Sequence, residues 1–521
     1  MVLIDALLRP ECYPHPVQTP IRLRQTHISW VLLTGSYAYK IKKPVNFGFL
    51  DFTTLAKRHF YCREELRLNR RLAAPIYLEV VPISGTVERP EVGGSGTPIE
   101  YAVKMRQFDE RELLSERADR GVLTPQEIDR LADRIAHFHQ EIPAVDPLDP
   151  YGRPEVVREH VRQNFAQING HLYGEEVRER LERLKAWSER EGERLAPVML
   201  SRREGGFVRE CHGDLHLGNT VLWQGEPLPF DAIEFNPALR WIDLLSEVAL
   251  TTMDLSAHRY RPFGFRFLNR YLWTTGDYES LTLLPYYLTY RAMVRAKIAH
   301  LTDPADLEGF LRYFRWAEQF SRRRRPFLIL VSGVTGSGKS TLAIQLSGEL
   351  EAIHLRSDVE RKRLAGLHWS EPSRSGLGDG LYRPEMTTKT YGRLLRLAEK
   401  ILQGGIGVVV DATFLRKHLR ASFTAMARRL KVPLVILTVR AAPEILKARV
   451  EERLKLAEDA SEATPEVLAA QLKAYEPPVA EEADRIFEVD TGRPLDLKEL
   501  LREILPARER GSPPGSNAFP A

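Results

Sequence analysis

Residues 333–341 read Gly-Val-Thr-Gly-Ser-Gly-Lys-Ser-Thr, which matches the phosphate-binding pattern G-x-x-x-x-G-K-S/T. An apolar run at 327–331 precedes this stretch and predicts a buried strand, and Leu342, Leu346 and Leu350 follow it at helical spacing. Glycines let backbone N–H groups turn toward phosphate oxygens, and a helix N-terminus adds partial positive charge. The stretch therefore predicts a nucleotide site on a strand–loop–helix unit.

Within this loop, we expect Lys339 to reach the β- and γ-phosphates and the Ser340 hydroxyl to ligate Mg²⁺. The residues predicted to contact the nucleotide are Gly333, Gly336, Ser337, Gly338, Lys339, Ser340 and Thr341. Asp411 ends the apolar run 407–411 and is the predicted second metal ligand. Strand-like runs at 407–411 and 433–439 alternate with helical patterns, which predicts an α/β domain with a parallel sheet.

The composition is that of a globular protein with two to four domains. The 521 residues include 75 Lys and Arg against 70 Asp and Glu, and the net charge of +5 is small for this length. This balance counts against nucleic acid and membrane surfaces as main partners. The N-terminus lacks the features of a secretion signal, no apolar run reaches membrane-spanning length, and the three cysteines lack metal-ligand spacing. We therefore expect reduced thiols in a cytoplasmic protein.

The chain is predicted to consist of two halves and a tail. The run at 322–326, Arg-Arg-Arg-Arg-Pro, precedes the strand of the phosphate loop and marks the expected boundary. This gives a first domain at 1–321, a nucleotide-binding domain at 322–508 and a disordered Gly/Pro/Ser-rich tail at 509–521. In the first domain, strand-like segments fill 22–42 and 77–108, and helical patterns dominate from 123 onward, which predicts an α+β fold.

A second motif lies at 212–219, His-Gly-Asp-Leu-His-Leu-Gly-Asn. Asp214 and Asn219 have the spacing of the kinase catalytic loop, and Asp231 closes an apolar stretch downstream. Phosphoryl transfer needs a carboxylate that orients the attacking hydroxyl, which is the role predicted for Asp214. It also needs oxygen ligands for Mg²⁺, which are predicted to be Asn219 and Asp231. The alternative is a polar turn capped by Asp and Asn.

This octapeptide resembles the catalytic loop of the aminoglycoside-phosphotransferase-like kinases, a branch of the protein-kinase-like fold that phosphorylates small molecules. The stretch 236–243, Asn-Pro-Ala-Leu-Arg-Trp-Ile-Asp, also resembles that family. The resemblance implies an ATP-binding lysine on the segment 37–43, where we favour Lys40 over Lys42, and a partner glutamate, where we favour Glu65 over Glu64. The alternative is a set of exposed charges. The family's Gly-rich loop is missing, and Ala-Ile-Glu follows Asp231.

Further charged residues suggest an acceptor site and a lid in the second half. Asp358 and Arg361 lie one helical turn apart after a short predicted strand, so they share a face at the edge of the sheet. Asp358 could orient or deprotonate an acceptor hydroxyl, and Arg361 could hold the acceptor; the alternative is a charged first turn of a helix. Arg449 and Arg453 are four apart and could close over the phosphates, or they could be solvated surface residues.

The motifs at 357–362 and 411–414, with the segment 459–463, resemble the P-loop kinases related to zeta toxins and gluconate kinases. The whole chain resembles a bacterial fusion of an aminoglycoside-phosphotransferase-like domain with such an ATP-binding domain. The resemblance implies a phosphotransferase that uses ATP and Mg²⁺ and acts on a small hydroxylated metabolite. Two alternatives stay open, namely an ATP-binding regulatory module with one degenerate kinase domain and a nucleic-acid end kinase.

Overall fold

The computed structural model describes residues 2–48, 50–323, 325–373, 380–456 and 460–504. Contacts divide the chain into two compact units, Met1–Gln167 with Glu189–Asp254, and Ile168–Ser188 with Leu255–Ala521. The long helix α6 (Glu175–Glu204) contributes residues to both units. The boundary predicted at residue 322 follows helix α11 (Leu307–Ser321) and stays a prediction. The predicted tail and Asp459 lie outside the described residues.

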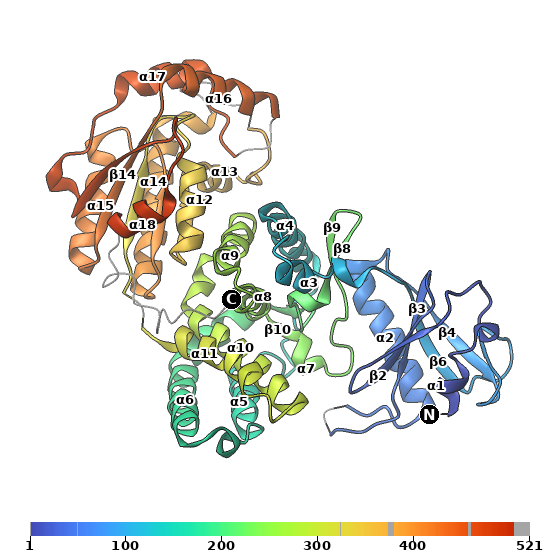
Figure 1. Cartoon of the computed structure of the whole chain (residues 1–521). Helices are drawn as coiled ribbons and strands as arrows, with labels where there is room; N and C mark the ends of the chain where they lie inside the picture. The colour runs from blue at the N-terminus through green and yellow to red at the C-terminus, as the bar shows by residue number, and fades with distance from the viewer. Residues whose placement is uncertain (1, 49, 324, 374–379, 457–459, 505–521) are drawn as a thin grey trace. The chain divides into compact units, whose positions relative to one another are not determined.

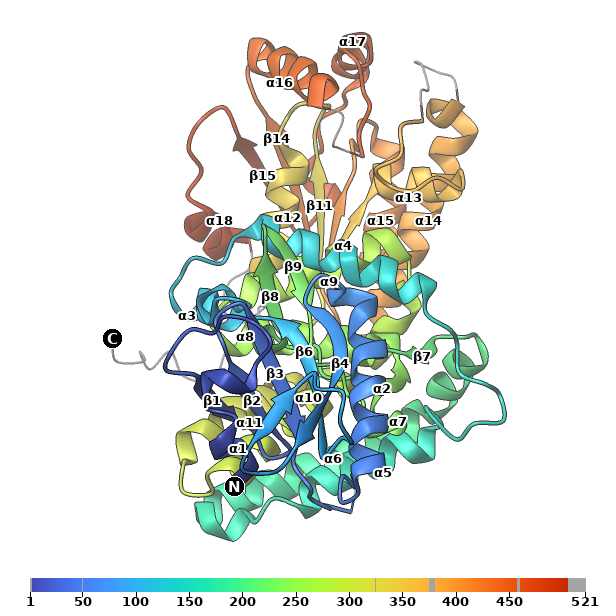
Figure 2. The same cartoon turned by 90° about the vertical axis from the view of Figure 1, so that its right-hand side faces the viewer.

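The first unit is built on a six-stranded antiparallel sheet in the order β1-β2-β3-β6-β4-β5 (Figure 2). The strands are β1 (Arg22–Gln25), β2 (Ser29–Leu33), β3 (Tyr37–Lys42), β4 (Tyr77–Gly85), β5 (Pro90–Val92) and β6 (Glu100–Arg106). Because side chains alternate along a strand, Tyr39 and Ile41 of β3 join the apolar cluster of the N-terminal helix α1 (Val2–Ala6). Ala38 joins the opposite cluster, against helix α2 (Leu55–Ala73), where Lys40 and Lys42 are also directed.

Helices dominate this unit after residue 123, as predicted, but 208–243 also holds four short strands that the sequence pattern did not predict. Two of them form the hairpin β8 (Thr220–Trp223) and β9 (Glu226–Pro229), and β7 (Val208–Glu210) pairs with β10 (Trp241–Asp243). The helices are α3 (Leu114–Asp119), α4 (Pro125–Glu141), α5 (Pro154–Ala166), α7 (Pro237–Arg240) and α8 (Leu244–Ala257). The predicted α+β class is confirmed for this half.

The second unit contains a five-stranded parallel sheet in the order β12-β13-β11-β14-β15 (Figure 1). The strands are β11 (Leu328–Ser332), β12 (Ile353–Arg356), β13 (Val408–Asp411), β14 (Leu434–Arg440) and β15 (Arg485–Asp490). The four predicted strands of this half are therefore present, and the predicted α/β class is confirmed. After β11 the chain continues to β12 and β13 on one side and later to β14 on the other. Ligands of such sheets bind at the carboxyl ends of the strands where the order reverses.

Helices cover this sheet and account for its apolar strands. The residues of β11 are fully buried, as expected for a parallel strand with both faces covered. The helices that follow it are α12 (Lys339–Glu349), α13 (Ser357–Leu364), α14 (Pro384–Gln403), α15 (Lys417–Leu430), α16 (Pro443–Leu456), α17 (Pro465–Ala474) and α18 (Leu497–Ile504). Two further helices of the unit, α9 (Arg261–Thr275) and α10 (Leu284–Thr302), precede α11.

From the sequence we expect reduced thiols and no segment that spans a membrane. Cys12, Cys62 and Cys211 are buried thiols outside any disulfide. Among the described residues, no helix combines the length and the apolar character needed to cross a bilayer.

Candidate active sites

The loop 333–338 joins β11 to α12, in the predicted strand–loop–helix arrangement. Gly338 has a φ of 84°, in the left-handed region that favours glycine. A side chain at Gly333 would come within 2.5 Å of the carbonyl oxygen of Val439. Because α12 begins at Lys339, its first N–H groups lack acceptors within the helix and can bind an anion.

Two predicted site residues act electrostatically on the lysine of this loop. Lys339 is only 7% exposed, and burial lowers the pKa of its ammonium group, whereas Asp411 and Asp358 act in the opposite direction. Asp411 lies beside the loop because its strand pairs with β11 in the register Val331 to Asp411. The structure thus brings both predicted carboxylates into electrostatic range of Lys339.

The Asp411 carboxylate has the properties of a metal ligand. Among the described residues, neither of its buried oxygens has a hydrogen-bond partner. The His354 ring and the Arg356 guanidinium approach Oδ2 to 3.6 and 3.7 Å, beyond hydrogen-bond distance. Burial alone would raise the pKa of Asp411, but His354, Lys339 and Arg356 hold it well below its usual range. An ionised carboxylate with unsatisfied oxygens suits a hard cation such as Mg²⁺.

Both predicted lid arginines on α16 reach the phosphate loop. Arg453 donates to the Thr335 hydroxyl at 2.8 Å. Arg449 donates to the carbonyl oxygen of Gly336 at 3.4 Å and to the hydroxyl and carbonyl of Thr491 at 2.9 and 2.8 Å. These contacts hold α16 against the loop, so the two arginines are not merely solvated surface residues.

Two neighbours of the loop were missed from the sequence. Gln471, on α17, accepts a hydrogen bond from the backbone N–H of Thr335 at 2.7 Å. Thr491, just after β15, donates to the carbonyl oxygen of Ser337 at 2.7 Å. Neither residue belongs to a recognisable motif, and only the tertiary fold brings them to residues 333–338.

The predicted acceptor pair lies on α13. Asp358 is in the first turn of this helix and Arg361 is one turn further on, which is the expected spacing. Arg361 donates to the carbonyl oxygen of Leu381 at 3.3 Å. The helix begins after Arg356, which makes no side-chain cap hydrogen bond, and Asp358 and Glu360 give it an acidic first turn, so the acceptor role and the alternative of a charged first turn both stay predictions.

In the first unit, Glu65 of α2 pairs with both candidate lysines of β3. Its carboxylate lies 2.8 Å from Nζ of Lys40 and 2.7 Å from Nζ of Lys42. Lys40 also pairs with Asp231, and Lys42 with Glu234. Burial raises the pKa of the Glu65 carboxyl, but the two lysines outweigh it and lower the value to about 2. Lys40 is therefore the lysine that contacts a predicted metal ligand.

The predicted catalytic loop, 212–219, is held in place by polar contacts within the loop and to Phe230 and Glu247. Asn219 donates through Nδ2 to Oδ2 of Asp214 at 3.2 Å and to its backbone carbonyl at 3.1 Å. The buried His212 contacts the carbonyl oxygen of Phe230 at 2.9 Å, and the backbone N–H of Gly213 donates to Glu247 at 2.6 Å. The Asp214 side chain stays 31% exposed, so it can meet an acceptor.

The hairpin β8–β9 explains why the two predicted metal ligands of this unit are neighbours. Thr220 pairs with Pro229, and the backbone N–H of Phe230 donates to the carbonyl oxygen of Asn219 at 2.9 Å. Asp231 follows directly, with a φ of 63°, and its N–H donates to the hydroxyl of Tyr77 at 3.2 Å. The short hairpin thus brings together residues twelve positions apart.

The turns of this sheet agree with the missing Gly-rich loop, because Gly35 lies at the end of β3 opposite to Lys42. Gly35 lies in the turn between β2 and β3, where its N–H donates to Gln107 at 2.9 Å. The turn between β1 and β2 is next to Lys42, because Ser29 pairs with Lys42. This turn, 26–28, reads Thr-His-Ile and contains no glycine.

Two family models match the chain, one for each half. The model described as "Phosphotransferase enzyme family" matches residues 61–233, and the model described as "AAA domain" matches residues 328–478. The relatives Rv2004c of Mycobacterium tuberculosis and Mb2027c of Mycobacterium bovis, both named as uncharacterized proteins, are each 30% identical over 499 residues. The match covers 93% of this chain and 94% of each relative. The chain belongs to the family of these mycobacterial proteins. It is a phosphotransferase of the kinase class, and the predicted fusion is confirmed.

Solved structures with a similar fold include two small-molecule kinases. A choline kinase from Cryptosporidium parvum is 12% identical and covers 61% of this chain and 94% of its own, with a TM-score of 0.37. A gluconokinase from Sinorhizobium meliloti is 24% identical and covers 36% of this chain and 91% of its own, with a TM-score of 0.24.

Proposed function

We propose that the protein is an ATP- and Mg²⁺-dependent phosphotransferase with one nucleotide site in each half and a small hydroxylated metabolite as acceptor. The observation that supports the proposal is a carboxylate near each predicted nucleotide site: Asp214 accepts a hydrogen bond from Asn219 at 3.2 Å, and Asp358 acts electrostatically on Lys339. A protein that only binds nucleotide has no use for an acceptor-orienting carboxylate. The small net charge favours a small acceptor over a polyanion.

In the first unit, the acceptor hydroxyl would lie at Asp214. Its oxygen attacks the γ-phosphorus, the bond from that phosphorus to the β–γ bridging oxygen breaks, and ADP leaves. The hydroxyl proton passes to the Asp214 carboxylate. Lys40, held by Glu65, would bind the α- and β-phosphates, and Asn219 and Asp231 would hold Mg²⁺. A bound Mg²⁺ neutralises charge on the phosphates.

In the second unit, the same chemistry would use residues at the carboxyl ends of β11, β12 and β13. The amides of 333–341 and Lys339 would hold the phosphates, and Asp411 and Ser340 would supply oxygens to Mg²⁺. The buried, unsatisfied oxygens of Asp411 support this assignment. Asp358 would accept the acceptor proton, and Arg453 and Arg449 would close over the phosphates.

The test is a transfer assay with ATP labelled at the γ-phosphate, Mg²⁺ and panels of sugars, nucleosides, aminoglycosides and oligonucleotide ends. Variants Lys339→Ala and Asp214→Asn assign any transfer to one half. We expect label on one small-molecule class and a lower transfer rate in each variant, because each variant removes the contribution of one half. Label on oligonucleotides would favour an end kinase, and ATP binding without transfer to any panel would favour a regulatory module.

A further inference from the structure

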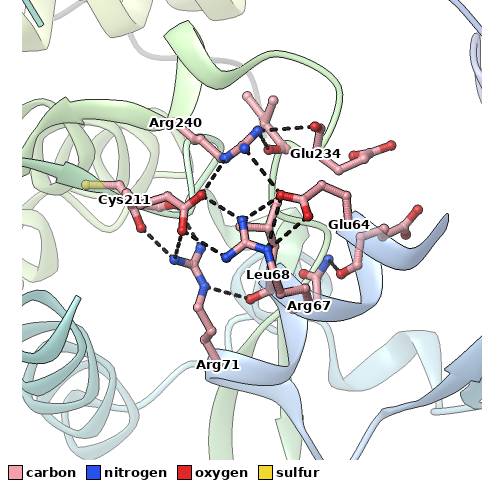
Figure 3. Close-up of polar contacts among 11 residues, drawn as sticks. Glu64, Arg67, Leu68, Arg71, Cys211, Glu234 and Arg240 are labelled. Carbon is pink, nitrogen blue, oxygen red and sulfur yellow. Dashed lines mark hydrogen bonds and ion pairs between the residues drawn. The ribbon is translucent and has the colours of Figure 1, made fainter. Parts of the chain in front are cut away.

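Helix α2 takes part in two charge networks. On one side, Glu65 pairs with Lys40 and Lys42. On the other side, Glu64, Arg67 and Arg71 extend toward the segment that precedes the catalytic loop (Figure 3). Spacings of three, four and seven residues place these three side chains along one face of the helix. One rigid helix therefore contacts both the lysine pair and the chain leading to Asp214.

The second network centres on Glu210, the last residue of β7. Glu210 is 6% exposed, and its carboxylate accepts hydrogen bonds from Arg67 at 2.7 and 3.1 Å, from Arg71 at 3.3 Å and from Arg240 at 3.1 Å. Arg240 also reaches Glu64, at 3.4 Å. Three guanidinium groups thus share the buried Glu210 carboxylate, and Glu64 provides a second carboxylate to Arg67 and Arg240.

The same arginines bind the backbone on both sides of the candidate active site. Arg71 donates to the carbonyl oxygens of Glu210 at 2.7 Å and Cys211 at 3.1 Å, immediately before the loop 212–219. Arg240 donates to the carbonyl oxygen of Glu234 at 3.1 Å, three residues after Asp231. The Glu234 side chain in turn pairs with Lys42, so it joins the two networks.

We propose that Glu210 is a positioning residue for phosphoryl transfer in the first unit. It holds α2, and with it Glu65 and Lys40, in a fixed position against the loop that carries Asp214. This inference rests on the proposed function of that site. Glutamine at this position would keep the shape but remove the one negative charge that contacts all three arginines, so α2 would shift relative to the loop. Small displacements of reacting groups lower the rate of the chemical step far more than they lower nucleotide binding.

The experiment uses the full chain with Lys339→Ala, in which remaining ATP hydrolysis, with water as acceptor, belongs to the first unit. Glu210→Gln is then added. We expect kcat to fall by about 10- to 100-fold, with the KM for ATP changed by less than about threefold. Glu226→Gln is the matched control, because Glu226 forms an exposed ion pair with Arg134 in the same unit. It should leave both constants unchanged.

Arg67→Gln gives a second readout, because this side chain is 48% exposed and its loss should not unfold the unit. It should lower kcat in the same direction, with an unchanged melting temperature. An unchanged kcat in Glu210→Gln, or in Arg67→Gln if Glu210→Gln fails to fold, overturns the inference. If Asp214→Asn abolishes hydrolysis while these variants keep it, only the positioning role fails. If hydrolysis survives Asp214→Asn, or if the Lys339→Ala chain shows neither hydrolysis nor transfer to the acceptor found by the labelled-ATP assay, the proposed function of this unit fails, and the inference fails with it.

Discussion

The side-chain oxygen of Asn269, on α9, accepts a hydrogen bond of 2.8 Å from the backbone N–H of His354, in β12. Its Nδ2 donates to the carbonyl oxygen of Ala352 at 3.0 Å, and Asn269 is only 3% exposed. Because β12 is the edge strand of the parallel sheet, Asn269 satisfies backbone groups that would otherwise lie open. Helix α9 thus belongs to the same compact unit as the phosphate loop, although it precedes the boundary predicted at residue 322.

Replacing Asn269 with leucine should destabilise the second unit. The change leaves one buried N–H and one buried carbonyl without partners, each at a cost of about 1–3 kcal/mol. Urea denaturation should show the loss as a lower midpoint. Gln403→Leu is the control, because among the described residues this exposed amide bonds to Glu399 within α14, and its change should stay within about 0.5 kcal/mol. Equal midpoints for the two variants would contradict the role of Asn269.

Because one nucleotide site is proposed for each half, we expect each chain to bind two nucleotides. With Mg²⁺ and a non-hydrolysable ATP analogue, titration calorimetry of the wild-type chain should give two molecules bound per chain. Lys339→Ala should leave one, because the buried ammonium group is the main positive charge within the loop. A wild-type value of one that disappears in Lys339→Ala would mean that the first unit does not bind nucleotide.

Asp214→Asn should separate chemistry from binding in the first unit. The amide keeps the shape and can still contact Asn219, but it cannot accept a proton. Positioned general-base catalysis contributes about 10²–10⁴-fold, so transfer by this unit should fall by that order while ATP affinity persists. Transfer rates are measured in the Lys339→Ala background. Undiminished transfer would rule out Asp214 as the base.

The phosphate loop could be predicted from the sequence because its determinants are local. Strand, glycines, lysine and helix all lie within 327–350, and the loop forms where the pattern predicts it. The Lys40–Glu65 pair was harder to predict from the sequence, because two lysines share a face of β3 and two glutamates are adjacent on α2. Only the packing of α2 on the sheet directs Glu65 to the lysines, whereas Glu64 pairs with Arg67 one turn along the same helix.

The contacts of Glu210 and Gln471 could not be predicted from local sequence patterns. Glu210 lies in a strand of three residues, and its partners come from positions near 70 and 240, so no local spacing connects them. Gln471 reaches the loop only because α17 packs beside α16. A single sequence carries no signal that distinguishes such residues from surface charges and amides.

The buried Glu247 predicts a pH dependence of stability. Burial raises the pKa of its carboxyl, but hydrogen bonds with His139 at 2.8 Å and the N–H of Gly213 at 2.6 Å outweigh it and lower the pKa to about 2. A glutamate in the unfolded chain has a pKa of about 4.3. Between the two pKa values, that is from about pH 4.3 down to about pH 2, the folded state therefore binds fewer protons than the unfolded state. The stabilisation is complete above about pH 4.3 and is lost as the pH falls toward 2.

Glu247→Gln isolates this contribution from those of other carboxylates. The difference in unfolding free energy between wild type and variant should be largest at pH 7 and should shrink between pH 4 and pH 2. Urea denaturation at pH 7, 4 and 3 measures it. A difference that is constant with pH would show that packing, rather than the ionised carboxylate, accounts for the effect of Glu247.

The last prediction concerns the acceptor site of the second unit. In the Asp214→Asn background, transfer to the acceptor found by the labelled-ATP assay belongs to this unit. Asp358→Asn should then lower kcat by about 10²–10⁴-fold and leave nucleotide affinity unchanged, because it removes the proton acceptor. Arg361→Ala should mainly raise the acceptor KM, since it removes binding shared by the ground and transition states.

Arg396→Ala is the control for Arg361, because this arginine lies exposed on α14. It should change neither constant. ATP hydrolysis without acceptor separates the two roles: Asp358→Asn should lower it, because Asp358 would also orient the attacking water, whereas Arg361→Ala should leave it unchanged, because water does not need the arginine that holds the acceptor. If both variants leave hydrolysis and transfer intact, Asp358 influences Lys339 only as a distant charge. The second unit would then bind ATP to regulate the first rather than phosphorylate an acceptor of its own.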